Sequence, residues 1–352
     1  MNEQRFQEIT GSYARLRIAV VGDFCLDRYL EIDPAKPETS IETGLPVYNV
    51  TNVRAQPGGA GTVLNNLVAL GVGTIIPVGF AGEDGEGYEL CRALAAKPGV
   101  CMDHFLQTCE RHTFSYCKPL VVEPAKAPRE LNRLDQKNWT PTPATLEERL
   151  RTAVAAVADR ADALILLGQV DVPETGVLTS RVLEAVGEIA RAKPGQLILA
   201  DNRHSLRGFP PVVFKMNVAE LAALTGTAPA STITEIALVA VELARRNGRF
   251  VFVTLAERGL VAAAPDGHSE HLPALPVRGE LDIVGAGDAV SANLTAALAA
   301  GATLPEALEL ANAGASIVVH QLGTTGSATV AQLRALMLGN GQADGTADGG
   351  IV

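Results

Sequence analysis

Short apolar runs that end in polar residues recur along this chain, and helical patterns lie between them. The runs are typical of buried strands and lie at 17–23, 163–168, 196–203, 212–216 and 250–254. The helical patterns with one apolar face include 145–158, 177–192 and 234–246. Strands alternating with helices predict a mainly parallel sheet covered on both faces, and right-handed crossovers bring the polar strand ends to one edge. We therefore expect an α/β fold with its ligand site at that edge.

Two segments, 29–55 and 105–135, contain short strands that polar residues and prolines interrupt. We expect them to pair as a small β-sheet that serves as a lid. The exposed edge and apolar face of such a sheet favour pairing with a second subunit, so we expect a homodimer. One domain is predicted over 12–338, and a disordered tail over 339–352, which has no periodic apolar face.

The stretch Asp282–Asp288 runs directly into a helical pattern at 289–300. Gly285 and Gly287 let the backbone turn tightly and approach a ligand, and the helix that follows points free N–H groups at the same spot. An anion is therefore expected there. A carboxylate such as Asp288 would repel a bound phosphate, so its presence there suggests that it accepts or donates a proton in a reaction. An anion site beside such a carboxylate indicates phosphoryl transfer. The alternative is an ordinary glycine-rich turn capped by Asp288.

The whole stretch resembles the D-[TV]-x-G-A-G-D signature of the ribokinase-like (PfkB) sugar kinases. A second signature of that family, P-G-G-A-x-N before a helix, is similar to 57–62, with Thr62 where asparagine is usual. The resemblance covers residues 16–338 and implies a three-layer α/β/α fold. It implies an enzyme that uses ATP and Mg²⁺, and it leaves open whether a monovalent cation such as K⁺ is required. It also implies that Asp288 is the catalytic base and that the phosphoryl group is held by the N–H groups of Gly285, Ala286 and Gly287.

Two carboxylates follow the first apolar run, where they would face the ligand edge of the sheet. Asp23 and Asp27 are suited to accept hydrogen bonds from neighbouring sugar hydroxyls. The alternative is that Asp23 caps a turn and Asp27 pairs with Arg28. The other predicted sugar-binding residues are Gly58 and Gly59, whose bare backbone admits a sugar closely, together with Thr62 and Asp171.

The resemblance also implies a nucleotide site. Asn217 and Glu220 form the N-x-x-E pair that orders Mg²⁺ and the ATP phosphates, with Glu220 acting mostly through water because Mg²⁺ keeps much of its hydration shell. The alternative for this pair is a helix start with a capping box, and both roles are compatible. The remaining implied nucleotide-binding residues are Thr254, Gly259 and Asn312, and Ala256 stands where the family usually has glycine.

Within the family, the chain looks most like the kinase module of ADP-heptose synthesis, which phosphorylates D-glycero-D-manno-heptose 7-phosphate at the anomeric hydroxyl. Such a substrate needs a cation near its distal phosphate, and the candidates are Arg28, Arg111, Lys118 and Arg133. Two alternatives stay open. One is a ribokinase- or fructokinase-like kinase of an unphosphorylated sugar, and the other is a catalytically weak sugar-binding regulator.

Charge and hydropathy narrow the partners further. A net charge of −10 argues against nucleic acid and anionic membranes, because both require a basic face. No apolar run approaches the ~20 residues that span a bilayer, and the start of the chain lacks a signal-peptide core, so we expect a cytoplasmic protein. The five cysteines form no C-x-x-C pair and are expected to be reduced.

Overall fold

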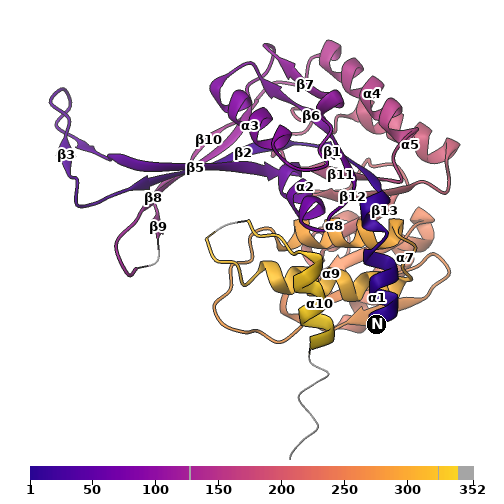
Figure 1. Cartoon of the computed structure of the whole chain (residues 1–352). Helices are drawn as coiled ribbons and strands as arrows, with labels where there is room; N and C mark the ends of the chain where they lie inside the picture. The colour runs from indigo at the N-terminus through magenta and orange to yellow at the C-terminus, as the bar shows by residue number, and fades with distance from the viewer. Residues whose placement is uncertain (127, 324, 340–352) are drawn as a thin grey trace, which may run out of the picture.

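The computed structural model describes residues 1–126, 128–323 and 325–339. A nine-stranded sheet lies at the centre of the molecule (Figure 1). The strand order is β16-β15-β14-β13-β12-β11-β1-β6-β7, and pairing is parallel from β14 to β7 and antiparallel for β15 and β16. The strands span β1 Arg17–Gly22, β6 Thr74–Gly82, β7 Phe105–Thr108, β11 Ala163–Gly168, β12 Leu197–Asn202, β13 Val213–Asn217, β14 Val251–Thr254, β15 Leu260–Ala263 and β16 Ser269–Leu272. The expectation of a mainly parallel sheet is confirmed.

Helices cover both faces of this sheet. One apolar core joins the sheet to α1 Glu3–Thr10, α2 Ala60–Ala69, α3 Gly85–Ala95, α8 Ala286–Ala299, α9 Leu304–Val318 and α10 Val330–Leu338. A second core joins its other face to α4 Ala144–Ala158, α5 Ser180–Ala192, α6 Val218–Thr225 and α7 Ile233–Asn247. Successive strand residues alternate between the two cores, so Val20 packs in the first and Val21 in the second. The three-layer α/β/α fold is therefore confirmed.

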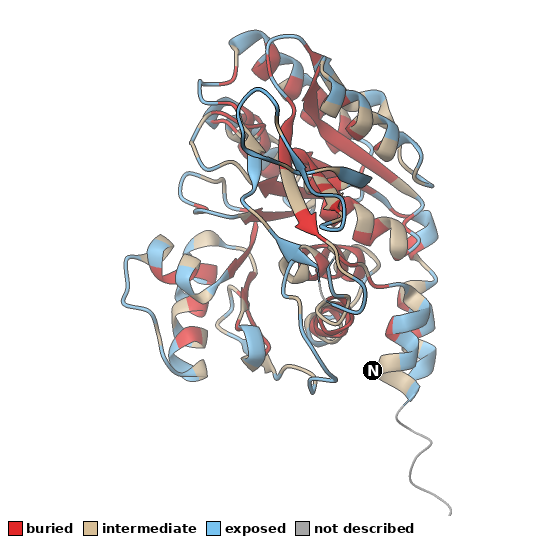
Figure 2. Cartoon of the chain, turned by 90° about the vertical axis from the view of Figure 1, so that its left-hand side faces the viewer, coloured by how far each residue is buried: buried red, intermediate tan, exposed pale blue. Residues whose placement is uncertain are grey.

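Figure 2 shows the consequence of this alternation, with the central strands buried and the outer faces of the helices exposed. Helix α5 begins at Ser180, later than the predicted 177, because the Thr179 side chain accepts a hydrogen bond from the N–H of Val182 and caps the helix there. No helix in the described residues is both long and apolar enough to cross a bilayer. Apart from Gly339, the tail predicted over 339–352 lies outside the described residues.

A small sheet projects from one side of the central sheet (Figure 1). Its strand order is β10-β8-β2-β5, with β9 also paired to β8, and its strands span β2 Phe24–Ile32, β5 Val50–Gly59, β8 Phe114–Val121, β9 Arg129–Glu130 and β10 Leu134–Gln136. Strands β3 Glu38–Thr39 and β4 Pro46–Val47 form a separate hairpin between β2 and β5. Only Asp23 separates β1 from β2, so the chain passes from the central sheet directly into the small one.

The bounds of this sheet differ from the predicted segments 29–55 and 105–135. Its strands begin at Phe24 and extend to Gly59, because the buried side chains of Phe24, Cys25 and Leu26 continue the apolar run of β1. Strand β7, at the start of the second segment, pairs with β6 in the central sheet instead. The small sheet therefore begins at the carboxyl edge of the central sheet, where the polar strand ends gather.

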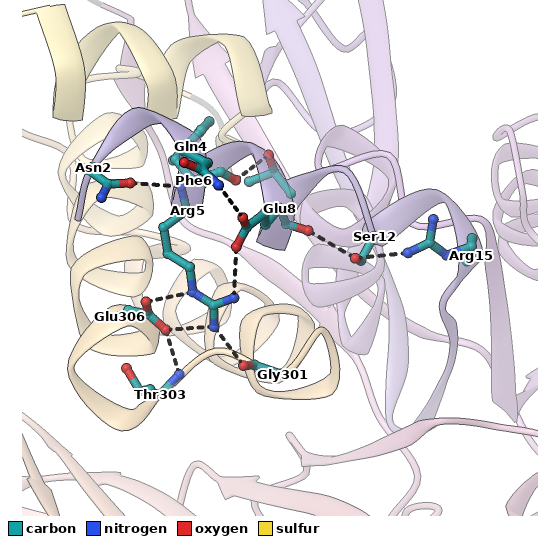
Figure 3. A network of polar contacts seen from close by, with 11 residues as sticks. Asn2, Gln4, Arg5, Phe6, Glu8, Ser12, Arg15, Gly301, Thr303 and Glu306 are labelled. Carbon is teal, nitrogen blue, oxygen red and sulfur yellow. Dashed lines mark hydrogen bonds and ion pairs between the residues drawn. The ribbon is translucent and has the colours of Figure 1, made fainter.

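Helix α1 is held against α9 by a polar network (Figure 3). The Arg5 guanidinium donates to both carboxylate oxygens of Glu306, at 2.8 and 3.1 Å, and to the carbonyl of Gly301 at 2.9 Å. Glu306 also forms a capping box with Thr303 at the start of α9. The hydrogen bond from Arg5 is the main reason why the pKa of Glu306 falls to about 2. Charge-assisted contacts of this kind keep α1 in the helical layer that contains α8.

Candidate active site

Helix α8 begins at the glycine-rich stretch. Gly285 is its N-cap and has a φ of 84°, a left-handed conformation that favours glycine. The N–H groups of Gly287 and Asp288 have no backbone acceptor in the described part of the chain, as is usual in a first helical turn. Helix α8 packs against α2, β11 and β12. Free N–H groups and the positive end of the helix dipole therefore offer an anion site beside the central sheet.

Asp288 lies in the first turn of α8, and protein surrounds it on most sides. Burial raises the pKa of its carboxyl to about 7, Asp201 adds to the increase, and Lys215 opposes it. Among the described residues, none donates a hydrogen bond to this carboxylate. A carboxylate that titrates near neutrality and has no fixed partner is suited to accept a proton from a hydroxyl group.

A buried ion pair lies beside this helix start. Lys215 Nζ on β13 is 2.7 Å from Asp201 Oδ2 on β12, and the two residues are register partners. Ser291 Oγ donates to the same Asp201 oxygen at 2.8 Å. None of these three residues was among the candidates predicted from the sequence. The available signal was a lysine inside an apolar run, where lysine is rare unless it is paired.

One face of the small sheet gathers polar and aromatic side chains near α8. Asp27 is the register partner of Gln56 on β5 and of Tyr116 on β8, and the neighbouring row on the same face holds Arg54, Tyr29 and Lys118. The Gln56 side chain donates to Thr325 Oγ1, and a Cβ built on Gly285 would lie 3.6 Å from Thr325 Cβ. This face of the sheet therefore lies close to the start of α8.

Asp27 is 6% exposed, and no described residue donates a hydrogen bond to its carboxylate. Burial raises its pKa, while the charges of Lys118 and Arg133 oppose the increase. The alternative pairing with Arg28 is wrong, because Arg28 lies 2.9 Å from Glu89 and 3.7 Å from Glu86. A buried carboxylate without a protein donor is suited to bind a hydroxyl of a ligand.

Asp23 has a different environment. Its two carboxylate oxygens accept hydrogen bonds from three backbone N–H groups, those of Gln169 at 2.8 Å, Val170 at 3.2 Å and Val177 at 2.7 Å. A carboxylate has about four acceptor sites, so these bonds use most of its capacity. The prediction that Asp23 is a sugar ligand stays a prediction. The structure shows it holding the loop after β11, in line with the alternative of a turn cap.

The close approach that Gly58 and Gly59 permit is to the protein itself. A Cβ on Gly58 would lie 2.6 Å from Asp27 Oδ2, and one on Gly59 would lie 2.5 Å from the Asp23 carbonyl oxygen. Both glycines therefore allow β5 to pack against β2 at this point. Thr62 is buried in α2, and its methyl group would lie 3.7 Å from a Cβ on Gly285. Thr62 thus belongs to the contact between α2 and α8.

Asp171 lies at the rim of the same region. Its carboxylate is 2.5 Å from Lys137 Nζ and 3.0 Å from His204 Nε2. The hydrogen bond from Lys137 is the main reason why its pKa is lowered. Lys137 Nζ also lies 5.9 Å from the centre of the Tyr116 ring, which connects this rim to the face that carries Asp27. Asp171 is therefore engaged by protein cations, and a sugar would compete with them.

Asn217 and Glu220 form a capping box at the start of α6. Asn217 Oδ1 accepts from the Glu220 N–H at 2.9 Å, and Glu220 Oε2 accepts from the Asn217 N–H at 2.8 Å. The helix-start alternative is therefore present in the structure. Burial is the main reason why the pKa of Glu220 is raised. Each side chain keeps one further polar atom for water or ligand, so these residues fit contact with Mg²⁺ through water.

The described residues contain no group of three or more His, Cys, Asp or Glu side chains that could hold a metal ion.

The remaining predicted nucleotide residues are spread over three elements. Thr254 ends β14 and donates to the Met216 carbonyl at 3.4 Å. Gly259 has a φ of 93°, and a Cβ there would lie 2.0 Å from the Leu272 carbonyl oxygen, so the turn itself requires glycine. The Asn312 amide donates to the Pro273 carbonyl at 2.8 Å. This bond gives Asn312 a structural role in holding the segment after β16, and its nucleotide role stays a prediction.

The backbone conformation of Ala256 gives a physical reason why glycine is usual at this position. Its φ of 54° is left-handed, which costs a residue with a Cβ roughly 1–2 kcal/mol. We expect Ala256→Gly to stabilise the protein by about 0.5–1 kcal/mol in urea unfolding, since the relief of strain exceeds the added flexibility of the unfolded chain. Ala219→Gly, on the exposed side of α6, is the matched control and should lose about 1 kcal/mol. Equal losses in both variants would contradict the interpretation.

A helix start with free N–H groups, a carboxylate with a pKa near 7 in its first turn and a second carboxylate without a protein donor fit the chemistry of an ATP-dependent carbohydrate kinase. The chain belongs to the pfkB family of carbohydrate kinases, because the model of that family matches residues 16–331. The resemblance of the glycine-rich signatures to this family is thus confirmed.

Curated relatives agree with the family. The chain is 32% identical over 321 residues to the "Bifunctional protein HldE" of Azorhizobium caulinodans, covering 91% of this chain and 64% of that protein. It is 33% identical over 319 residues to the protein of the same name from Rhodospirillum rubrum, covering 90% of this chain and 61% of that protein. The chain therefore spans less than two-thirds of the length of these relatives.

Solved structures share the fold. Arabidopsis thaliana ribokinase complexed with ribose and ATP superposes with a TM-score of 0.62 at 20% identity, covering 90% of this chain and 95% of that one. Phosphofructokinase-2 from Escherichia coli in complex with substrates and products superposes with a TM-score of 0.68 at 18% identity, covering 91% and 97%. The ribokinase-like fold is confirmed by these similarities.

Proposed function

We propose that this carbohydrate kinase phosphorylates a sugar that already carries a phosphate, and that the sugar is a heptose 7-phosphate. The observation that supports the proposal is the small-sheet face on which an open carboxylate and cations lie together. Asp27 is available for hydroxyl groups, while Lys118 and Arg133 lie close enough to affect its pKa. Such a face suits a ligand with hydroxyl groups at one end and an anion at the other.

The four cations considered for the distal phosphate separate into two groups. Arg28 is paired with acidic residues of α3, and Arg111 donates to Thr140 through its carbonyl at 2.5 Å and its hydroxyl at 3.0 Å. Both are engaged in holding the fold. Lys118 lies 5.0 Å from the centre of the Tyr29 ring, and Arg133 lies 5.0 Å from the centre of the Tyr116 ring. The Arg133 guanidinium also donates to both carboxylate oxygens of Asp135 at 2.7 Å, so a ligand phosphate would compete with Asp135 for it. These two cations lie over the aromatic residues of the face and remain the candidates, and Lys118, which donates to the Tyr29 hydroxyl at 3.5 Å, is the less engaged of the two.

The proposed reaction follows from the positions of Asp288 and the α8 start. The oxygen of the acceptor hydroxyl forms a bond to the γ-phosphorus of ATP while Asp288 accepts the proton of that hydroxyl. The bond from the γ-phosphorus to ADP breaks at the same time. The N–H groups of Gly287 and Asp288 hold the charge that develops on the transferred group, while the Ala286 N–H donates to the Ile283 carbonyl at 3.3 Å. Glu220 would contact Mg²⁺ through water, and the ion would neutralise phosphate charge. Positioning and electrostatics supply most of the acceleration.

A panel of acceptors tests the proposal. We expect kcat/KM to be highest for heptose 7-phosphate when it is compared with free ribose, fructose and adenosine under saturating ATP and Mg²⁺. An unphosphorylated sugar that is better by tenfold or more would establish the ribokinase- or fructokinase-like alternative. Sugar binding without turnover of any acceptor would establish the regulator. Replacing K⁺ in the assay with a bulky organic cation tests the monovalent-cation requirement.

Removal of one small-sheet cation should affect the phosphorylated acceptor selectively. We expect Lys118→Met to lower kcat/KM for heptose 7-phosphate by about 10–100-fold, because a charge-assisted hydrogen bond contributes about 1.5–3 kcal/mol. Lys36→Met is the matched control, since Lys36 pairs with Asp33 outside the proposed site. A loss of the same size for free heptose would show that Lys118 does not bind the distal phosphate.

We also propose a homodimer that forms through the small sheet. Strand β5 is the last strand of that sheet, so one side of its backbone has no strand partner within residues 1–126, 128–323 and 325–339. Leu45, Tyr48, Val50 and Val53 are largely exposed on it and on the adjoining hairpin. We expect light scattering at micromolar concentration to give twice the mass of 36.8 kDa, and Val53→Asp to give the monomer. A monomeric mass for the unmodified protein would contradict the proposal.

A further inference from the structure

Lys215 carries a buried charge, and the packing of the fold gives no reason for a charged side chain at this position. It is 6% exposed inside a parallel strand, between apolar neighbours, and its ammonium group is paired with Asp201 on the next strand. A buried ion pair of this kind adds little net stability compared with apolar side chains of the same size, because both charges lose their hydration. A functional reason for the pair is therefore worth seeking.

The position of the Lys215 ammonium group supplies a functional reason for the pair. A Cβ built on Gly287 would lie 2.9 Å from Lys215 Nζ, so the charge lies directly against the first turn of α8. That turn is the positive end of the helix dipole, where a cation is disfavoured and an anion is stabilised. A lysine and a helix start that converge on one point have the same preference for an anionic ligand.

The protein balances this charge in a way that leaves it available. Asp201 Oδ2 accepts from Lys215 at 2.7 Å and from Ser291 Oγ at 2.8 Å. Because Ser291 is a second donor to the same oxygen, Asp201 keeps a hydrogen bond if Lys215 turns toward a ligand. Gly287 leaves the space that a side chain would fill, so the ammonium group can lie at the α8 start.

We propose that Lys215 is a catalytic residue of the anion site, and that its ammonium group exchanges Asp201 for the transferring phosphoryl group. This inference rests on the proposed phosphoryl transfer and adds a fixed cation to it. Lys215 stays protonated throughout, while the acceptor proton goes to Asp288 and ADP leaves. The ammonium group stabilises negative charge on the phosphoryl oxygens as the bond to ADP breaks.

The test compares three variants with the unmodified protein. Lys215→Met removes the charge at similar length, and Lys215→Met with Asp201→Asn avoids leaving a buried carboxylate unpaired if the single variant fails to fold. Lys193→Met is the matched control, because Lys193 pairs with Asp159 on the surface. The acceptor is whichever sugar the unmodified protein phosphorylates fastest, so the result does not depend on the heptose assignment.

We expect the double variant to melt near the temperature of the unmodified protein, with kcat lower by about 10²–10³-fold. Calorimetric titration with Mg²⁺ should show about tenfold or greater loss of affinity for a non-hydrolysable ATP analogue, and unchanged affinity for ADP, which lacks the γ-phosphoryl group. A kcat within threefold of the unmodified protein would overturn the inference, and so would equal losses of affinity for the two nucleotides. A different acceptor preference in the unmodified protein would overturn only the heptose proposal.

Discussion

Asp288→Asn is expected to lower kcat by about 10²–10⁴-fold while nucleotide affinity stays within a few-fold of its original value. The amide cannot accept the proton of the acceptor hydroxyl, but it has almost the same size as the carboxylate and leaves the start of α8 intact. Steady-state kinetics with the preferred sugar and calorimetric titration of ADP measure the two effects. Near-normal turnover in this variant would remove Asp288 from the mechanism.

The pH dependence of the same residue has a definite sign. The folded-state pKa of about 7 lies above the ordinary value of 3.8, so the folded protein binds the Asp288 proton more tightly than the unfolded chain does. The stability that this group contributes is therefore fully present below about pH 4 and is lost as pH rises through about 7. The amide that replaces the carboxylate in Asp288→Asn has no charge to desolvate. This variant should therefore melt higher than the unmodified protein at about pH 8 and at the same temperature near pH 4.

Activity should show the complementary trend, because the base must be deprotonated. We expect kcat/KM of the unmodified protein to rise with pH through about 7. Asp103→Asn, at an exposed position, is the control and should change neither the profile nor the melting temperature. A rate limb near pH 4 would contradict the raised pKa of Asp288.

Asp27→Asn is expected to weaken acceptor binding strongly. Its carboxylate has no protein donor in the described residues, and we propose that a bound sugar supplies the partner. The amide offers fewer acceptor sites, and the loss should be about 1–3 kcal/mol, or about 5–150-fold in kcat/KM for the sugar. The KM for ATP should change little, because Asp27 lies on the small sheet.

A partly exposed carboxylate of the same region provides the control for Asp27. Asp33 pairs with Lys36 at the end of β2, and Asp33→Asn should leave kcat/KM unchanged. If Asp27→Asn raised the KM for ATP as strongly as that for the sugar, Asp27 would not be a sugar ligand. If Asp23→Asn lowered the melting temperature without a selective loss of sugar affinity, its loop-holding role would be supported.

The fold could be predicted from the sequence because its signals are local. Apolar runs and amphipathic helices repeat in order, and this order leads to a parallel sheet with two helical layers through general rules of chain connection. The glycine-rich start of α8 could be predicted for the same reason, since Gly285 and Asp288 are neighbours in the chain. The ends of elements were less certain, as Thr179 shows, because single caps decide them.

The parts of the site that were missed depend on contacts between distant residues. Asp23 and Asp27 look alike in the sequence. Only the folded position of the loop after β11 shows that backbone N–H groups occupy acceptor sites of the Asp23 carboxylate. Lys215 meets Asp201 through the register of two parallel strands, which a single sequence does not specify. Sugar binding by Gly58 and Gly59 stays a prediction, and the structure adds that a Cβ at these positions would meet the Asp27 carboxylate and the Asp23 carbonyl.

The central claim is that this kinase acts on a phosphorylated sugar, and one matched pair of acceptors tests it most directly. Heptose 7-phosphate and the same heptose without its phosphate differ only in the group that Lys118 and Arg133 are proposed to bind. The account predicts a kcat/KM for the phosphorylated sugar that is higher by about 10–100-fold, the contribution of one charge-assisted contact. Equal values, or a preference for the free heptose, would contradict the claim.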